Sequence, residues 1–270
     1  KGSGNADRSQ NKRDHVKAPG EYAKIMLPEL TFPYLIPGQE VLLDDGKIHL
    51  KIVEKAENVT ENGGENTQDK RYFAKVLWGG LLKSRKSAAL PGAKIYPPTL
   101  TNSDLANIKI AKEMGVTGVM QPFVRDHSDL ECVKEALREA GAEDIRLFAK
   151  IENMDGVRKL EKLLPAADEI VIARGDLGNA VHLWDLPGVQ RQISEKCRAA
   201  GKPFMVVTQM LASMERSPVP TRAEVNDIFH AVMDGAASIM VTGETAVGDY
   251  PVEVIRYMVN TVRSAEKEEN

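Results

Sequence analysis

Two charged side chains stand two residues apart in an apolar stretch of the chain. In LFAKIENMDG, residues 147–156, Lys150 and Glu152 lie in a run with the character of a β-strand. Side chains at positions i and i+2 of a strand point to the same face of a sheet. The spacing permits two interpretations: a structural ion pair, or a cation and a carboxylate that work together at the end of a strand.

A second carboxylate, Asp176, follows the next apolar run in the segment ARGDLG. Either carboxylate alone is consistent with a helix cap or a solvated loop. Together, at neighbouring strand ends, Glu152 and Asp176 offer the oxygen ligands that hold Mg²⁺, which typically takes one or two carboxylates with water and substrate oxygens. Lys150 would then stabilise negative charge near the metal, as phosphoryl transfer or enolate chemistry requires.

Two further residues at the same predicted edge suit an anionic substrate. If a helical turn begins at Gly175, its free N–H groups, with that of Asp176, can hold a carboxylate or phosphate. The short motif GDLG nevertheless fits any strand-to-helix turn. Thr208 ends the run MVVT, and it is either an ordinary strand threonine or a hydroxyl that binds a substrate carboxylate or helps to deliver a proton.

The strands that must position these residues recur through the second part of the chain. Between them lie helix-like segments such as SDLECVKEALREAG and TRAEVNDIFHAVMDG, and alternating βα units predict a parallel sheet. Polar residues crowd the C-terminal end of every predicted strand, which favours a TIM-type (β/α)8 barrel over an open doubly wound sheet. Five strands do not close that barrel, so we expect it to be incomplete in this chain. The predicted strands are 115–123, 146–152, 169–175, 203–209 and 238–244.

The first part of the chain has a different texture. Strand-like runs flank Asp45-Gly46, a dipeptide favoured in tight hairpins, and residues 62–70 form another turn-rich connection. We therefore predict a flexible segment over residues 1–20, a β-rich domain over 21–92, and the partial barrel over 93–270.

The composition is that of an ordinary soluble protein. Of 270 residues, 42% are hydrophobic and 28% charged, and the net charge is −3. We expect no nucleic-acid partner, because there is no global basic field, and no membrane partner, because no stretch approaches about 18 apolar residues. The only cysteines, Cys132 and Cys197, lie far apart without CxxC spacing. This argues against a disulfide or zinc framework and indicates a reducing, cytoplasmic location. The nucleotide motifs GxGxxG and GxxxxGK[ST] are absent from the sequence.

Several long segments, taken in order, resemble the pyruvate kinase family. The strongest are AKIENMDGVRKLEKLL, EIVIARGDLG, AGKPFMVVTQMLASM and SPVPTRAEVNDIFHAVMDGAASIMVTGETAVGDYP. VLLDDGKIHLKIVE and WGGLLKSRKSAALPG resemble the small β-barrel lid domain that the family inserts after its third barrel strand. The resemblance implies phosphoryl transfer from phosphoenolpyruvate to ADP, giving pyruvate and ATP in glycolysis, with Mg²⁺ (or Mn²⁺) and K⁺ as cofactors and a homotetrameric assembly.

The resemblance also implies roles for the barrel residues. Lys150 matches the lysine that stabilises the transferring phosphoryl group and the enolate. Glu152 and Asp176 match the two carboxylates that bind the divalent metal. The backbone of Gly175 and Asp176, with Thr208, matches the cradle for the substrate carboxylate.

Other positions combine a match with a departure from the family. Lys86 matches a lid lysine that approaches the nucleotide phosphates, but the family segment KGVNxP reads KSAALP here, without the asparagine. Phe123 and Arg125 match the F-x-R at the lip of the site and imply a substrate contact for Arg125. Pro122 stands where the family usually has serine, and Ala180 replaces an acidic residue.

The family's first three barrel strands, with motifs that contact phosphate and K⁺, would precede residue 1, and its C-terminal domain would follow residue 270. This organisation implies a fragment with little activity alone. Two alternatives stay open: a metal-dependent pyruvate-enolate lyase or aldolase, which needs no nucleotide lid, and an inactive module completed by a partner that covers the exposed strand edges.

Overall fold

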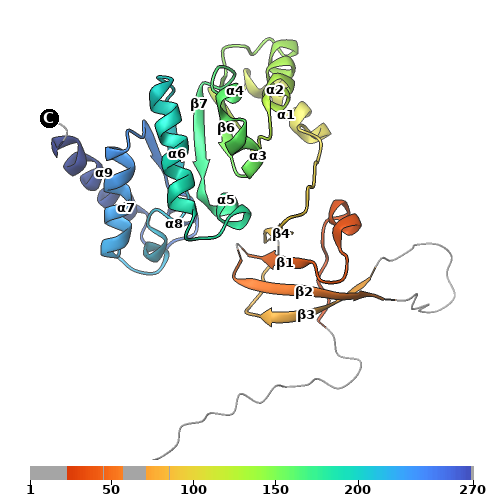
Figure 1. The fold of residues 1–270 in the computed structure, drawn as a ribbon. Helices are drawn as coiled ribbons and strands as arrows, with labels where there is room; N and C mark the ends of the chain where they lie inside the picture. The colour runs from red at the N-terminus through yellow and green to blue at the C-terminus, as the bar shows by residue number, and fades with distance from the viewer. Residues whose placement is uncertain (1–22, 45, 57–70, 85, 269–270) are drawn as a thin grey trace, which may run out of the picture.

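The computed structural model describes residues 23–44, 46–56, 71–84 and 86–268. They contain a four-stranded antiparallel sheet of order β3-β2-β1-β4 and a five-stranded parallel sheet of order β5-β6-β7-β8-β9 (Figure 1). The predicted N-terminal segment 1–20, Asp45 and the connection 62–70 lie outside the described residues.

The antiparallel sheet is built from short strands around a small apolar core. Its strands are β1 (Glu40–Leu43), β2 (Ile48–Lys55), β3 (Tyr72–Trp78) and β4 (Ala88–Ala89), preceded by the 3-10 helix η1 (Glu29–Tyr34). β1 and β2 form the predicted hairpin, with Leu43 opposite Ile48. Asp44 and Gly46 have φ values of 49° and 80°, the left-handed backbone that tight hairpin turns require. The boundaries of this domain stay a prediction.

The five parallel strands follow one another in sequence order. They are β5 (Gly118–Gln121), β6 (Arg146–Ile151), β7 (Glu169–Ala173), β8 (Phe204–Val207) and β9 (Ser238–Met240), and all five overlap the predicted segments. A doubly wound sheet reverses its strand order at a switch point. The unbroken order 5-6-7-8-9 has no such point and is the order of successive strands in a (β/α)8 barrel.

The two faces of the parallel sheet bury different amounts of apolar surface. Alternate residues of one face, such as Leu147, Ile151 and Ile172, join the large core that the helices cover. On the opposite face Val171, Ala173 and Val207 form a small cluster. Coverage of one face by helices is the arrangement of a barrel wall, so the predicted incomplete (β/α)8 barrel with a small β domain is confirmed.

Helices begin where the sequence supplies caps. Thr101 and Thr221 each form a capping box, with Asp104 and Glu224 respectively, and the Asp126 side chain accepts from the N–H of Ser128. The helices are α1 (Asn102–Ala111), α2 (His127–Glu139), α3 (Met154–Arg158), α4 (Leu160–Leu163), α5 (Arg174–Ala180), α6 (Leu186–Ala199), η2 (Ala212–Glu215), α7 (Arg222–Met233), α8 (Gly243–Ala246) and α9 (Pro251–Glu268).

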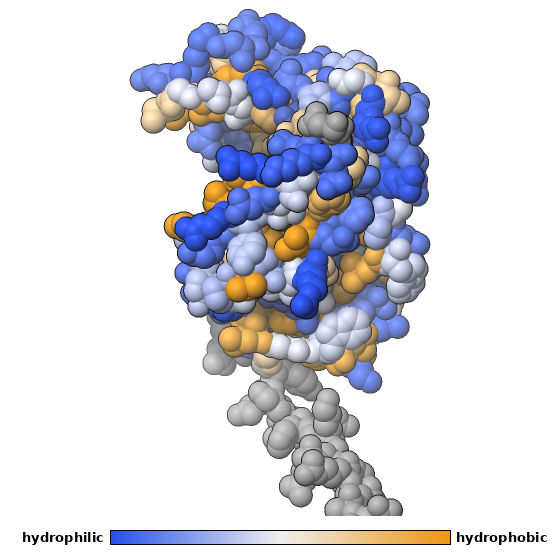
Figure 2. All heavy atoms as spheres, turned by 90° about the vertical axis from the view of Figure 1, so that its left-hand side faces the viewer, coloured by the Kyte–Doolittle hydropathy of each residue, from blue (hydrophilic) through white to orange (hydrophobic). Residues whose placement is uncertain are grey.

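The surface beside α9 mixes polar and apolar side chains (Figure 2). Val252, Ile255 and Val259 of α9 are 63%, 43% and 37% exposed, and their spacing places them on one side of the helix. In the part of the chain that the structure describes, no helix has the length and apolar character to cross a membrane.

A glycine in α3 allows the helix to pack against the turn after β5. A Cβ on Gly156 would lie 2.6 Å from the carbonyl oxygen of Val124. That oxygen also accepts a 3.1 Å hydrogen bond from the Asn153 side chain, so it cannot move away freely. Alanine at position 156 must therefore displace backbone.

We predict that G156A lowers the free energy of unfolding by about 1–3 kcal/mol, the usual cost of overpacking, in urea denaturation followed by circular dichroism. G188A in α6 is the matched control, since a Cβ there meets nothing within 4 Å and alanine is the better helix former. Equal stability of the two variants would contradict this account.

Candidate active site

A buried carboxylate lies at the C-terminal end of β6. Glu152 is 3% exposed. Its Oε2 accepts a 2.7 Å hydrogen bond from the backbone N–H of Phe123, and its Oε1 lies 2.7 Å from Nζ of Lys150. The two oxygens are thus held by groups from two neighbouring strands, and a carboxylate buried in this way needs both partners.

Lys150 points to the sheet face opposite the helices. Strand alternation places it on the same face as Phe148, which packs against the small cluster of Val171, Ala173 and Val207. Its side chain is 24% exposed, against 1% for Glu152. The structure confirms that Lys150 and Glu152 project together, and it leaves the lysine partly open to solvent.

The end of β7 meets the end of β8 through a hydroxyl. The N–H of Gly175, in the first turn of α5, donates to Oγ1 of Thr208 at 2.8 Å, and that hydroxyl donates to the carbonyl of Val207 at 2.5 Å. Arg174 donates to the carbonyl of Thr208 at 2.8 Å and pairs with Asp227 at 2.8 Å. The predicted neighbours Gly175 and Thr208 are therefore in contact, with the Gly175 N–H bound by the threonine.

Asp176 supplies a second carboxylate at this edge. It lies half-buried in the first turn of α5, directly after β7, which pairs in parallel with β6 through Ile151 and Ile172. Among the described residues no cluster of three His, Cys, Asp or Glu side chains forms. Two carboxylates on adjacent strand ends nevertheless fit the donor set of Mg²⁺, which takes its remaining ligands from water and substrate.

The candidate nucleotide lysine lies in the antiparallel sheet region. Nζ of Lys86 is 2.8 Å from Oδ1 of Asp44. The hydrogen bond from Lys86 holds the pKa of Asp44 below its usual value, against a smaller opposing effect of burial, and the charge of Lys47 adds to the lowering. Asp44 thus holds Lys86 at the β1–β2 turn.

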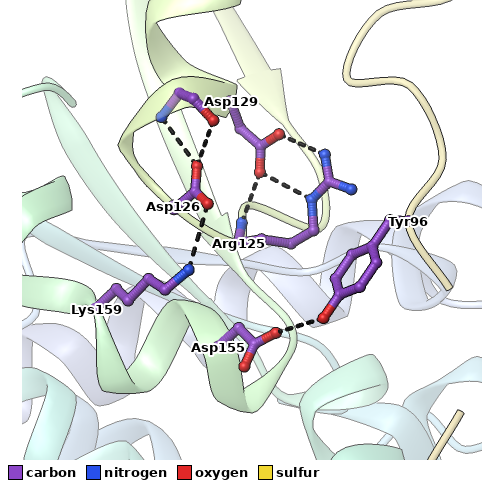
Figure 3. Close-up of a pocket in the computed structure, with 7 residues that line it drawn as sticks. Tyr96, Arg125, Asp126, Asp129, Asp155 and Lys159 are labelled. Carbon is purple, nitrogen blue, oxygen red and sulfur yellow. Dashed lines mark hydrogen bonds and ion pairs between the residues drawn. The ribbon is translucent and has the colours of Figure 1, made fainter. Parts of the chain in front are cut away.

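Arg125, in the turn before α2, binds the first turn of that helix and the chain that returns from the antiparallel sheet. Its guanidinium binds both oxygens of Asp129, at 2.5 and 3.0 Å, and donates to the carbonyl of Pro97 at 3.1 Å. Figure 3 shows this pair beside Tyr96, at the wall of a cavity of 280 Å³ that Asp126, Asp155 and Lys159 also line. The substrate contact of Arg125 stays a prediction.

The backbone of three residues at this edge has a conformation that the sequence did not reveal. Phe123, Thr208 and Gln209 have φ values of 51°, 76° and 54°, a left-handed region rare for bulky or β-branched residues and found most often at functional sites. In Phe123 this geometry accompanies the N–H bond to Glu152. The match to the F-x-R motif indicated that Phe123 lies at the site, but it did not indicate that the Phe123 backbone binds Glu152.

Glu244 at the end of β9 is a further buried carboxylate. It is 2% exposed, and it accepts from the N–H groups of Thr242 at 2.8 Å and Leu211 at 3.2 Å. It therefore ties the loop after β8 to the end of β9. Glu244 ends the predicted strand 238–244, but the sequence did not indicate that its side chain joins these two loops.

A family model described as pyruvate kinase, barrel domain, matches residues 11–255. The chain belongs to the pyruvate kinase family. The pyruvate kinase of Geobacillus stearothermophilus is 40% identical over 233 residues, which are 85% of this chain and 38% of that protein. That of Bacillus licheniformis is 38% identical over 230 residues, with the same two shares.

The pyruvate kinase of Chlamydia trachomatis serovar D is 34% identical over 242 residues, which are 90% of this chain and 47% of that protein. The chain thus spans less than half the length of these pyruvate kinases. The five parallel strands are part of the family's barrel, and the antiparallel sheet is its lid.

We predict that K150M lowers the free energy of unfolding by about 3–5 kcal/mol, because the buried Glu152 loses its cation. The K150M/E152Q double variant should recover part of this loss in urea denaturation, since no unpaired charge is left. K159M is the matched control: Lys159 pairs with Asp126 at 3.3 Å, but both side chains are at least 40% exposed, so its loss should cost less than about 1 kcal/mol. Equal losses in K150M and K159M would contradict the assignment.

A further prediction concerns the contribution of Asp129 to the pH dependence of stability. Burial raises the pKa of this carboxyl, but hydrogen bonds from Arg125 and Thr99 outweigh it and lower the pKa to about 2. A group with a lowered folded pKa stabilises the fold above its unfolded pKa, here 3.8, and loses that contribution as pH falls through the folded value. The stability difference between wild type and D129N should therefore be constant above about pH 5 and shrink towards pH 2 in urea titrations. A difference independent of pH over this range would refute the prediction.

Proposed function

We propose that this chain carries the lid and the later barrel strands of an enzyme that transfers a phosphoryl group from phosphoenolpyruvate to ADP. The observation that carries the proposal is the Lys150–Glu152 pair. Its 2.7 Å contact lies at the end of a barrel strand, beside a strand followed by Asp176, in a chain of the pyruvate kinase family. We extend the proposal to glycolysis, a cytoplasmic location and a homotetramer.

Lys150 neutralises charge on the transferring group and on the enolate oxygen. A fixed ammonium is effective here because phosphoryl transfer depends mainly on positioning and on neutralising negative charge. The partly open side chain of Lys150 can reach a substrate from the sheet face that carries no helices. Glu152 holds the ammonium at the strand end while its other oxygen is fixed by Phe123.

Glu152 and Asp176 are the residues that would hold the divalent metal. When bound, Mg²⁺ or Mn²⁺ supplies positive charge against the phosphate and enolate oxygens. The carboxylate of Glu152 is preoriented by the Phe123 N–H, so it loses little conformational freedom on binding a cation. We include K⁺ as a second cofactor on the basis of family membership alone.

Gly175, Asp176 and Thr208 form the proposed cradle for the substrate carboxylate. The Thr208 hydroxyl holds the Gly175 N–H at 2.8 Å and thereby sets the start of α5 relative to β8. Lys86 is the proposed partner of the nucleotide phosphates. Its ion pair with Asp44 must yield to the phosphates, which carry more negative charge than one carboxylate.

Binding of Mn²⁺ to the full chain tests the metal assignment. We expect electron paramagnetic resonance titration to show a bound Mn²⁺ in wild type and weaker binding in E152Q and in D176N. E169Q is the matched control, because Glu169 is a buried carboxylate (5% exposed) at the opposite end of β7. Binding by the E152Q/D176N double variant as tight as in wild type would refute the assignment.

Dependence of the reaction on nucleotide distinguishes the proposed phosphoryl transfer from the activity of a lyase. Pyruvate release from phosphoenolpyruvate that requires ADP supports the proposed transfer. Decarboxylation of oxaloacetate without nucleotide would favour the lyase. Both assays are made on the full chain, which spans 38–47% of the length of the relatives described above.

A further inference from the structure

Four residues carry the chain from the lid back to the barrel. Ile95 packs against the apolar core of the lid, whereas Leu100 packs against the large core of the barrel. Residues 96–99, here called the crossover, lie between them. The position of the lid relative to the barrel depends in part on how firmly this crossover is held.

Arg125 holds the crossover from the barrel side. Its guanidinium donates to the carbonyl of Pro97 at 3.1 Å and to Oγ1 of Thr99 at 3.4 Å. Its central carbon lies 5.5 Å from the ring centroid of Tyr96, within the range of a cation–π contact. One side chain therefore touches three of the four crossover residues.

Asp129 orients this guanidinium and binds the crossover itself. Both carboxylate oxygens accept from Arg125, and one of them accepts from the Thr99 hydroxyl at 2.6 Å. Asp129 is 3% exposed, so water competes poorly for these bonds. The planar guanidinium suits a two-pronged contact that lysine cannot reproduce.

Two further bonds tie the same four residues to the barrel. Gln121, at the end of β5, donates from its side chain to the carbonyl of Thr99 at 3.2 Å. The hydroxyl of Tyr96 donates to Asp155 in α3 at 3.3 Å, as Figure 3 shows. The crossover is thus bound through backbone and side chains by β5, by the turn after it, and by α2 and α3.

We propose that the Arg125–Asp129 pair is a clamp that fixes the crossover and so positions the lid over the ends of the barrel strands. Arg125 is then a positioning residue, and its value for the reaction rests on the proposed function, in which the lid brings Lys86 to the nucleotide. The turn that presents Arg125 also presents the Phe123 N–H to Glu152. One short turn therefore connects the lid's anchorage with the candidate metal ligand.

The clamp is tested by the spread of distances between lid and barrel in the full chain. Cys132 on α2 is exposed and serves as one spin-label site, and K75C on the exposed face of β3 supplies the other. Cys197 is buried, and burial raises its pKa to about 12, so it stays unlabelled. We expect one narrow distance peak in double electron–electron resonance for the labelled parent, and loss of that peak in R125M.

Three further variants, one of them a control, sharpen this comparison. R125K keeps the charge without the two-pronged contact, and it should restore the narrow peak only in part. R216M removes a different arginine–aspartate pair, Arg216–Asp249 at 2.9 Å, and should leave the peak unchanged. T99V/Y96F removes hydroxyls of the crossover while Arg125 and Asp129 stay in place, and it should broaden the peak.

A narrow peak in folded R125M, as judged by circular dichroism, would overturn the clamp. If R125M does not fold, the T99V/Y96F variant decides, and a peak as narrow as that of the parent overturns the proposal. The result is independent of turnover and of Mn²⁺ binding. Failure of the metal assignment would leave the distance data intact, and failure of the clamp would leave the metal assignment intact.

Discussion

The structure around the candidate site depends on how the carboxylate of Glu152 is buried. A carboxylate with 1% of its side chain exposed loses its hydration, and it is tolerated only when charge and hydrogen bonds replace the lost water. Lys150 supplies the charge from the same strand. The Phe123 N–H supplies the hydrogen bond from the neighbouring strand end, through a left-handed residue that makes the turn tight enough to reach it.

The parallel sheet makes this arrangement possible because one of its faces packs against the helices and the other carries the candidate site. Leucines, isoleucines and valines on one face bury against the helices, which contributes most of the apolar burial. The other face has only a small cluster beside Lys150. A polar rim can therefore exist at the strand ends without a gap in the main core. Thr208 and Glu244 tie adjacent rim loops together, so the rim residues are placed by several strands at once.

The crossover, residues 96–99, attaches the lid to the barrel, and it is short and held by several hydrogen bonds. Rotation of the lid requires a change of backbone angles in residues 96–99, and two of these are Pro97 and Pro98, whose φ angles are restricted. The remaining freedom is limited by Arg125 and Asp129. The ion pair between Lys86 and Asp44 acts inside the lid, where it keeps the lysine at the β1–β2 turn.

Sequence alone determined the class of fold, the approximate strand positions and the candidate residues of the site. Spacing by two put Lys150 and Glu152 on one face, alternating βα segments predicted the parallel sheet, and the motifs identified the family. It did not reveal that Arg125 faces the crossover, because Pro97, Thr99 and Asp129 approach it only after the lid has folded back. Nor did it reveal the left-handed Phe123, Thr208 and Gln209, since their side chains disfavour that backbone and only surrounding contacts enforce it. Local periodicity encodes which face a side chain takes, whereas the partner it meets there depends on segments distant in the chain, and only the tertiary structure brings these together.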